Sequence, residues 1–348
     1  MLNVNGRNLT MHTTGVQRYT QQILDCWGKS DNSFSVVMPS RPMHGPIGHL
    51  WEQFILPTML IKQDVLWSPS NTGPILCPAK QVITMHDFAT LDHPEWTSRK
   101  FSIFYRFLLP KIANRCDGII AVSDYTKSRI LHHVNIDPDK VVVIKNGVDS
   151  KFYKLSDSFV NGALIRKKYG MPSGRYVLSV SSIEPRKNIS SLLKAWEKIC
   201  PFIDDDIQLV LVGRSNPRIF ADSGLNCIPP RVVFTGFVDD VDLPSLYQDA
   251  LVFAYLSLYE GFGLPPLEAM AAGVAVLTSN TTSIPEVVAD KAITVNPLSI
   301  DEIADGLLLL LNNDSLRVRL AMDGPIHAKS FNWTHTGKQT FEYIKRFE

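Results

Sequence analysis

Short runs of apolar, mostly β-branched residues recur along the chain, separated by stretches long enough to hold a helix. Such runs are typical of parallel strands that are buried on both faces. A first series occupies residues 35–38, 65–67, 81–85, 118–122 and 141–144, and a second occupies residues 176–180, 208–212, 232–235, 251–255, 275–278 and 292–295. Strands that alternate with helices predict βαβ units, so both series indicate an α/β fold.

The segment between the two series, residues 149–172, has Lys, Ser, Asp and Gly in place of strand periodicity. We interpret it as a linker between a first domain at residues 1–165 and a second at residues 170–330. At 348 residues the chain is also longer than one hydrophobic core usually supports. We expect two doubly wound Rossmann-like domains facing a central cleft, where the carboxyl ends of both sheets meet. Residues 331–348 have helical spacing, and one interpretation is that they pack back on the first domain.

The composition excludes several classes of protein. The net charge of +1 and the charged fraction of 20% are ordinary for a globular protein and argue against a nucleic-acid partner. The five cysteines are scattered and include no CxxC pair, which predicts a reducing compartment and no structural zinc. Because the N-terminus lacks the apolar run of a signal peptide and no run is long enough to cross a bilayer, we expect a cytoplasmic protein.

The most specific motif is YEGFGLPPLEAMAAG at residues 259–273. Its glycines let the backbone turn sharply, and Pro265 fits the start of a helix whose free N–H groups attract phosphate. Glu260 in the loop and Glu268 in the helix cannot share one helix face, so we expect them to bind different parts of a ligand, a sugar and a ribose. The alternative is that Glu268 stabilises the helix N-terminus and that Glu260 is a solvated loop charge.

A second candidate site, SSIEPRKN at residues 181–188, follows the first strand of the second domain. Arg186 can bind a diphosphate through two hydrogen bonds and Lys187 can bind it as a point charge. Both cations would also stabilise a departing nucleoside diphosphate. The alternative is a surface loop with ordinary basic residues.

Three consecutive aspartates at residues 204–206 superficially match the Asp-x-Asp motif of metal-dependent nucleotide-sugar enzymes. They precede a strand instead of following one, which places them at the opposite end of the sheet from the predicted cleft. We interpret them, and also Asp239 and Asp240, as solvated turns. The sequence therefore predicts an enzyme with no cofactor, no metal-binding residues and activity in the presence of chelator.

Together with pieces of the first half, these motifs resemble the retaining glycosyltransferases of family 4, in the same order along the chain. The pieces are TTGVQRYT (13–20), MHDFATLDHPEW (85–96), AVSDYTKSRI (121–130), KNGVD (145–149), EPRKN (184–188) and the E-x7-E stretch (260–268). The resemblance covers nearly the whole chain and implies the GT-B fold. In finer detail the sequence is similar to bacterial mannosyltransferases that build lipopolysaccharide O-antigen or exopolysaccharide.

The resemblance implies a role for each matching residue. Gly15 would let a helix N-terminus approach the donor diphosphate, which Arg186 and Lys187 would hold from the other side. Glu260 would bind the hydroxyls of the donor sugar, and Glu268 the ribose. The other donor contacts that the resemblance implies are the backbone N–H groups of Phe262, Gly263 and Leu264, with the base resting against residues 236–238, which include Val238.

His86 follows an apolar strand, and the resemblance places it near the anomeric centre of the donor sugar. The alternative is a structural histidine with satisfied hydrogen bonds. Asp87 is a candidate to orient the His86 ring. The expected catalytic residues are therefore His86, Arg186, Lys187 and Glu260.

Retention of configuration requires the acceptor hydroxyl to arrive on the face that the leaving group vacates. Because no protein nucleophile is clearly placed for a double displacement, we expect a front-side reaction in which the β-phosphate oxygen takes the acceptor proton. The expected donor is GDP-mannose, with UDP-hexoses as the next candidates. The expected acceptor is a glycan that is attached to a membrane lipid.

Residues 97–116 contain five cations, no acidic residue and interleaved aromatic residues. Such a segment predicts peripheral contact with an anionic membrane, at the inner face of the cytoplasmic membrane. The alternative is a crossover helix of the first domain that is buried on its aromatic side and solvated on its basic side.

Other functions share a two-domain α/β architecture. A dehydrogenase is disfavoured because no GxGxxG follows either opening strand and cations stand where a dinucleotide fold needs glycines. A sugar phosphorylase, a nucleotide-sugar epimerase, a UDP-sugar-dependent glycosyltransferase and a non-catalytic nucleotide-sugar-binding protein stay open as alternatives. Their reaction products, or the absence of a product, distinguish them.

Overall fold

The computed structural model describes residues 1–348 apart from residues 12–14, 31, 154–161, 172, 183 and 214–227. Its contacts divide the chain into two compact units. Unit 1 comprises Met1–Gly147 and Phe331–Glu348, and unit 2 comprises Val148–Ser330. The boundary between Gly147 and Val148 thus lies earlier in the sequence than the boundary expected between residues 165 and 170. Residues 154–161 and 172 of the expected linker lie outside the described part of the chain.

Unit 1 is built on a parallel sheet with the strand order β2-β1-β3-β4-β5-β6. Its strands are β1 (Leu2–Asn5), β2 (Ser35–Val37), β3 (Val65–Ser68), β4 (Lys80–Met85), β5 (Gly118–Ala121) and β6 (Val141–Val143). The five runs expected in this half all lie on strands. Strand β1 was not among the expected strands; its four residues are all buried although Asn3 and Asn5 are polar.

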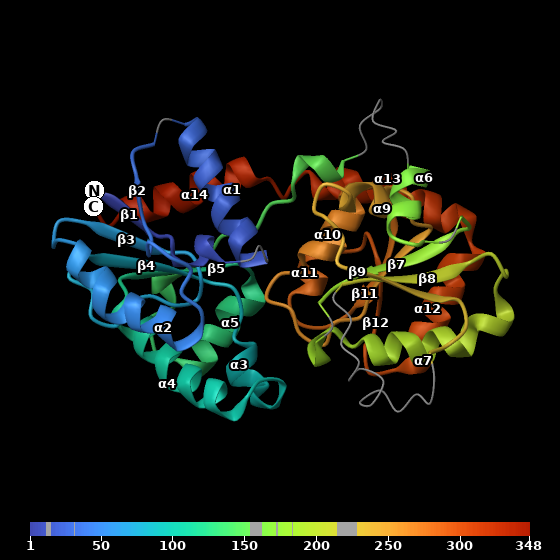
Figure 1. The fold of residues 1–348 in the computed structure, drawn as a ribbon, viewed down its shortest axis with the longest axis horizontal. Coiled ribbons are helices and arrows are strands. Elements are labelled where there is room, and N and C mark those ends of the chain that lie inside the picture. The colour runs from blue at the N-terminus through green and yellow to red at the C-terminus, as the bar shows by residue number, and fades with distance from the viewer. Residues whose placement is uncertain (12–14, 31, 154–161, 172, 183, 214–227) are drawn as a thin grey trace. The chain divides into compact units, whose positions relative to one another are not determined.

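Helices cover both faces of this sheet (Figure 1). They are α1 (Gly15–Lys29), α2 (Gly45–Leu50), α3 (Ala89–Asp92), α4 (Arg99–Arg115), α5 (Asp124–His133) and α14 (Trp333–Lys345). Short helical turns are η1 (Arg7–Thr10), η2 (Trp51–Ile55), η3 (Leu56–Met59), η4 (Pro94–Trp96) and η5 (Pro138–Lys140). The core between the sheet and helices α4 and α5 contains Ile83, Ile112 and Ile130, all fully buried.

The C-terminal helix α14 belongs to unit 1, where it packs against α1. Trp27 of α1 is buried there, and its indole N–H donates a hydrogen bond of 2.8 Å to the carbonyl of Gly337. The ring of Phe341 lies 5.4 Å from that of Trp27. Residues at the two ends of the chain therefore share one hydrophobic core.

Unit 2 repeats the architecture with the strand order β12-β11-β10-β7-β8-β9, again parallel. Its strands are β7 (Tyr176–Val180), β8 (Gln208–Val212), β9 (Val232–Gly236), β10 (Val252–Tyr255), β11 (Ala275–Ser279) and β12 (Ile293–Val295). All six expected runs lie on these strands. In the centre of the sheet, Val177 of β7 pairs with Leu209 of β8 and with Val252 of β10.

The helices of unit 2 lie on both faces of its sheet (Figure 1). They are η6 (Ser150–Phe152), α6 (Gly162–Lys168), η7 (Pro185–Lys187), α7 (Ile189–Ile199), η8 (Cys200–Phe202), α9 (Leu243–Gln248), α10 (Leu264–Ala271), α11 (Ile284–Val288), α12 (Ile300–Asn312) and α13 (Asp314–Ala328). Trp196 of α7 and Leu307 of α12 are fully buried in the core on one face. Because all the strands are parallel, the loops that follow them meet at one edge of the sheet.

Candidate donor site

The loop after β10 carries the most specific motif, and its anchor is a buried carboxylate. Glu260 is 7% exposed, which excludes the alternative of a solvated loop charge. Its Oε1 accepts hydrogen bonds from the hydroxyls of Ser257 (2.6 Å) and Tyr255 (2.7 Å). The loop after β11 holds the same segment from the other side, because the Ser283 hydroxyl donates to the carbonyl of Glu260 at 2.9 Å. Hydrogen bonds within the protein thus hold Glu260 in position without a ligand.

Lys187, from the loop after β7, completes this arrangement. Its Nζ lies 2.5 Å from Glu260 Oε1 and 2.7 Å from the Tyr255 hydroxyl oxygen. The two loops are also joined through the backbone, since the N–H of Leu258 donates to the carbonyl of Arg186 at 2.7 Å. Residues 73 positions apart in the sequence therefore form one buried ion pair. The structure brings together the cation and the carboxylate that the sequence analysis had assigned to separate motifs.

Arg186 forms a more open part of the same cluster. Its Nε lies 2.9 Å from Glu184 Oε2 and its Nη1 lies 3.6 Å from Glu260 Oε2. The Arg186 side chain is 26% exposed, whereas that of Lys187 is 8% exposed. Two cations and two carboxylates balance one another in this group. Of the two cations, Arg186 is therefore the more accessible to a ligand.

Burial and the neighbouring charges shift the pKa of Glu260 in opposite directions. Burial alone raises the pKa of a carboxyl group, but the neighbouring charges of Lys187 and Arg186 and hydrogen bonds from Lys187 and Ser257 lower the pKa of Glu260 to about 2. Burial lowers the pKa of Lys187, and the charge of Glu260 partly offsets this effect. The Glu260 carboxylate is therefore ionised at neutral pH and acts as a hydrogen-bond acceptor.

The turn into α10 depends on Gly263, which directly precedes the helix. Its φ of 110° is a conformation that L side chains rarely adopt. A Cβ at this position would lie 2.6 Å from Cδ1 of Ile284. Gly261 lies at a bend without a positive φ, so of the two glycines only Gly263 has the left-handed conformation. The helix then begins at Leu264 with Pro265 in its first turn, as expected.

Glu268 lies in the second turn of α10 and is 7% exposed. Its Oε2 accepts a hydrogen bond of 3.1 Å from the hydroxyl of Tyr247 in α9. Glu260 and Glu268 thus have different partners, in agreement with the expectation that they do not share one helix face. Glu268 lies beyond the first turn of α10, and its contact with a ribose stays a prediction.

The remaining donor residues expected in unit 2 lie in loops at the same edge of its sheet. Val238 follows β9 and is buried, while the neighbouring Phe237 is 63% exposed. Phe262 is buried, and its carbonyl accepts a hydrogen bond of 2.8 Å from the Ser283 hydroxyl. Ile183 of the basic loop lies outside the described residues. The contacts of these residues with a donor stay predictions.

His86 directly follows β4, at the carboxyl edge of the sheet of unit 1. Its Nε2 lies 2.7 Å from the carbonyl oxygen of Pro69, and since a carbonyl can only accept, this nitrogen carries the proton. Burial lowers the pKa of His86, so that the neutral ring is favoured. Tyr19 packs edge-on against the ring at 4.8 Å. The ring is therefore held in one tautomer, with Nδ1 as its acceptor.

The proposed orienting role of Asp87 is wrong. Its Oδ1 accepts a hydrogen bond of 3.2 Å from the backbone N–H of Ala89, at the start of α3. The group that fixes the His86 ring is instead the carbonyl of Pro69. Neighbouring residues after a strand often point apart, which is the reason for this difference.

Gly15 is the first residue of α1 and is exposed, as the expected approach to a ligand requires. No atom lies within 4 Å of a Cβ built at this position. The glycine is therefore not demanded by packing within the described part of the protein. Thr13 and Thr14 of the same motif lie outside the described residues.

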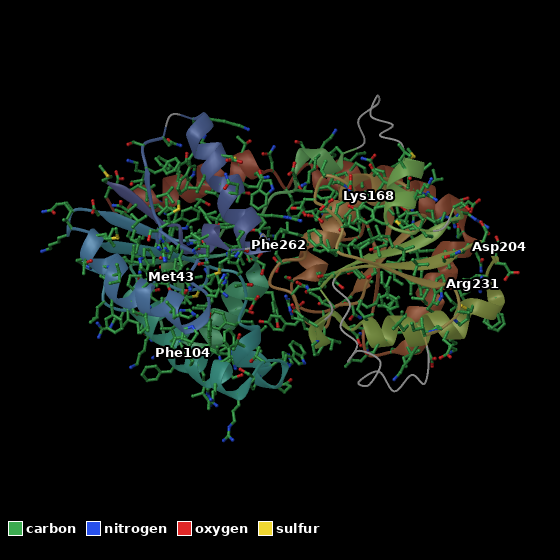
Figure 2. The ribbon with its side chains drawn as sticks, in the orientation of Figure 1. Met43, Phe104, Lys168, Asp204, Arg231 and Phe262 are labelled. Carbon is green, nitrogen blue, oxygen red and sulfur yellow. The ribbon has the colours of Figure 1, made fainter. Side chains whose placement is uncertain are left out.

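The aspartates considered as metal ligands are surface residues with cationic partners. Asp204 and Asp206 each lie 2.6 Å from Arg175 Nη2, and Asp205 lies 3.7 Å from Arg231. Figure 2 shows Asp204 and Arg231 at the outside of unit 2. The interpretation of residues 204–206 as a solvated turn is confirmed.

Asp239 has a similar environment. It lies 2.9 Å from Lys168 Nζ and accepts a hydrogen bond of 3.2 Å from the Tyr169 hydroxyl. Within the described residues, no group of three or more His, Cys, Asp and Glu side chains is placed to hold a metal ion. The same residues include no helix that is both long and apolar enough to cross a membrane.

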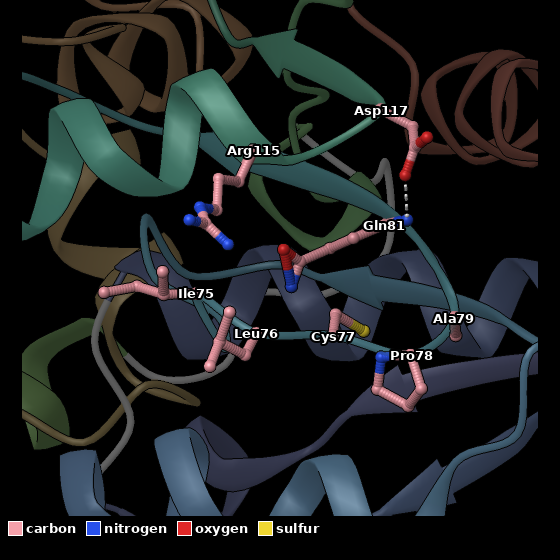
Figure 3. Close-up of a pocket in the computed structure, with 8 residues that line it drawn as sticks. All are labelled: Ile75, Leu76, Cys77, Pro78, Ala79, Gln81, Arg115 and Asp117. Carbon is pink, nitrogen blue, oxygen red and sulfur yellow. Dashed lines mark hydrogen bonds between the residues drawn. The ribbon is translucent and has the colours of Figure 1, made fainter.

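A cavity of about 610 Å³ lies in unit 1, away from these loops. Gln81, at the start of β4, and Asp117, just before β5, place it at the opposite edge of the sheet from His86. Figure 3 shows Arg115 of α4 facing Ile75 and Leu76 of the loop before β4. The Asp117 carboxylate accepts a hydrogen bond of 2.8 Å from the backbone N–H of Gln81. None of the expected site residues lines this cavity.

Two residues of the candidate donor site, Tyr255 and Ser257, were not expected from the sequence. Tyr255 is the last residue of β10 and Ser257 lies two residues after it, five and three residues before Glu260, and both hydroxyls donate hydrogen bonds to the Glu260 carboxylate. The only signal available was their position directly before the motif, at the carboxyl end of a predicted strand.

Comparisons with known proteins identify the family. Residues 163–325 match the model of glycosyl transferases group 1, and residues 66–152 match that of glycosyltransferase family 4. The O-antigen chain mannosyltransferase B of Escherichia coli is 34% identical over 272 residues, which cover 76% of this chain and 70% of that protein. The chain is a family 4 glycosyltransferase. The dehydrogenase alternative is thereby excluded.

A further relative supports the assignment to this family, and a solved structure supports the fold. The serotype-specific mannosyltransferase WbdA of Escherichia coli is 31% identical over 278 residues, which cover 77% of this chain but 34% of that protein. The solved structure of sucrose-phosphate synthase from Thermosynechococcus elongatus superimposes with a TM-score of 0.77 and 18% identity, covering 99% of this chain and 98% of that one. The expected GT-B fold is confirmed.

Replacing Tyr255 by phenylalanine is expected to destabilise the glycosyltransferase. The hydroxyl of Tyr255 accepts from Lys187 and donates to Glu260, so its loss leaves two buried charged groups with one partner fewer each. The expected decrease in the free energy of unfolding is about 1–3 kcal/mol, measured by urea denaturation. Tyr153→Phe, at a half-buried tyrosine of the same unit, is the control. Equal stability of the two variants would contradict this role of Tyr255.

Proposed function

We propose that this glycosyltransferase transfers mannose from GDP-mannose to a glycan acceptor, with retention of configuration and without a metal ion, in the synthesis of a cell-surface polysaccharide. The observation that carries the choice of sugar is the 34% identity with O-antigen chain mannosyltransferase B over 70% of that protein. The alignment with WbdA, which is also a mannosyltransferase, supports the same choice. The acceptor that fits such a pathway is a lipid-linked glycan.

The geometry of unit 2 supports a sugar diphosphate as the donor. Arg186 and Lys187 supply two adjacent positive charges, and Glu260 supplies an ionised acceptor for sugar hydroxyls. Because Lys187 is paired with Glu260, a diphosphate first meets the more exposed Arg186. It then competes with Glu260 for Lys187, which leaves Glu260 available to the sugar.

In the proposed reaction, the bond between the anomeric carbon and the diphosphate oxygen breaks as the acceptor oxygen approaches on the same face. The acceptor proton passes to a β-phosphate oxygen, and the anomeric carbon forms its new bond to the acceptor oxygen. Arg186 and Lys187 stabilise the charge that grows on the departing diphosphate. The roles of His86 and Gly15, which lie in unit 1, stay predictions.

A donor panel tests the proposal. The thermal unfolding of the protein is measured with GDP-mannose, GDP, UDP-glucose, UDP-galactose and ADP-glucose. A donor present at 100 times its dissociation constant stabilises the folded state by about 2.7 kcal/mol, so GDP-mannose is expected to raise the melting temperature by several degrees. A larger shift with a UDP-hexose would favour the UDP-sugar-dependent alternative.

Product analysis with GDP-mannose and a mannose-containing oligosaccharide then tests the reaction. We expect an α-linked product by NMR, since the donor is α-linked, and at least half of the activity in excess EDTA. A β-linked product would contradict retention, and loss of activity that added Mg²⁺ or Mn²⁺ restores would contradict metal independence. Binding of GDP-mannose without transfer or hydrolysis would favour the non-catalytic alternative.

A further inference from the structure

Large apolar side chains are exposed on α4 of unit 1. Phe101 is 43% exposed, Phe104 39% and Phe107 61%, whereas the buried face of the helix is formed by residues such as Leu109 and Ile112. One alternative for residues 97–116 is a crossover helix that is buried on its aromatic side. The helix does connect β4 and β5, but its phenylalanines lie outside the core. A role in core packing therefore does not explain them.

A second group of exposed apolar residues lies next to α4, on α2 and η2. Ile47 is 64% exposed, Leu50 56% and Phe54 67%. His49 of α2 joins the two groups, because its ring lies 5.1 Å from that of Phe104 and its Nε2 lies 3.2 Å from the Tyr105 hydroxyl oxygen. Figure 2 shows Phe104 on the outer side of unit 1. The two groups thus belong to one surface.

The exposed charges of α2, η2 and α4 have a single sign, because Glu52 of η2, their one acidic residue, is fully buried. Helix α4 carries no acidic residue, and its cations Arg99, Lys100, Arg106, Lys111 and Arg115 are all exposed. The Nζ of Lys111 lies 3.6 Å from the centre of the Phe107 ring, so cations and aromatic rings are interleaved. We call the exposed apolar residues of α2, η2 and α4, together with these cations, the basic aromatic surface.

We propose that the basic aromatic surface binds the headgroup region of an anionic lipid bilayer. Phenylalanine and leucine side chains insert at the interface between headgroups and acyl chains, while lysine and arginine side chains attract anionic lipid. Such a flat, negatively charged partner matches both the apolar residues and the positive charge. A second copy of the same surface does not match, because it would bring five further positive charges against the first five.

Vesicle flotation with the whole chain tests this proposal. The vesicles contain phosphatidylcholine alone or phosphatidylcholine with phosphatidylglycerol, and neither donor nor acceptor is present, so the result is independent of the reaction proposed above. We expect the protein to float with the anionic vesicles, to float much less with the neutral ones, and to lose binding as the salt concentration rises. Absence of flotation with anionic vesicles at low salt would overturn the proposal.

Variants locate the contact. The double variant Lys100→Gln/Lys111→Gln is expected to bind anionic vesicles about 30-fold more weakly, and Lys338→Gln/Lys345→Gln on α14 is the matched control. Leu50→Ser/Phe107→Ser is expected to weaken binding as well, with Met322→Ser/Ile326→Ser on α13 of unit 2 as its control. Equal loss in the test and control variants would overturn the proposal. So would a concentration-dependent dimer that the test variants abolish, because the surface would then bind protein.

Discussion

Replacing Lys187 by alanine is expected to reduce turnover by two or more orders of magnitude. In the proposed reaction Lys187 neutralises charge on the departing diphosphate, and removing one such contact raises the barrier by roughly 3–4 kcal/mol, by analogy with an oxyanion-hole donor. Turnover of GDP-mannose is measured at a saturating donor concentration. Activity within threefold of the parent protein would contradict the assignment.

The same substitution also leaves Glu260 as a buried charge without its closest partner, which costs about 3–5 kcal/mol of stability. A loss of activity must therefore be separated from unfolding. The double variant Lys187→Met/Glu260→Gln removes both charges, and we expect it to recover most of the stability but none of the activity. Lys198→Ala, at an exposed lysine of the same unit, controls for the loss of a positive charge and should behave like the parent.

Replacing Glu260 by glutamine is expected to abolish turnover and to change the acid stability of the protein. The pKa of Glu260 is lowered from 4.5 to about 2 in the folded state. The ionised carboxylate therefore stabilises the fold above about pH 4.5, and this contribution is lost as the pH falls through 2. The loss amounts to about 3 kcal/mol in the parent protein and is absent from the variant.

Urea denaturation at a series of pH values between 5 and 2 measures this difference. Asp205→Asn serves as the control, because the Asp205 side chain is fully exposed and distant in sequence from the site. We expect the control to follow the parent curve. A Glu260→Gln variant whose stability falls as steeply as that of the parent would show that Glu260 is not the group that titrates.

Most strands could be predicted because buried parallel strands consist of continuous apolar runs. Strand β1 is the exception, since Asn3 and Asn5 give it the pattern of a polar segment. The side chain of Asn5 is buried because its amide donates a hydrogen bond of 2.8 Å to Glu52, which follows α2 in the chain. A polar residue that is satisfied by a partner 47 positions away cannot be distinguished from a solvated one in the sequence.

The candidate donor site was also predictable only in part, because the sequence shows local motifs but not the contacts between them. The motifs identified Arg186, Lys187 and Glu260 because the loops after β7 and β10 are each distinctive in sequence. That Lys187 pairs with Glu260 follows from the order of the strands, in which β7 and β10 are neighbours. The contact between Tyr255 and Lys187 depends on the same adjacency of β7 and β10. Likewise, exposure of the α4 phenylalanines depends on which face of the helix meets the sheet.

The position of α14 also determines the order in which the two units are completed during synthesis. Unit 2 is one continuous segment inserted between the two parts of unit 1, so all of its residues leave the ribosome before α14 does. Until then Trp27 has neither the Gly337 carbonyl nor the Phe341 ring to cover it. Unit 1 therefore begins to form before unit 2 is synthesised, but the core around Trp27 is completed only after it.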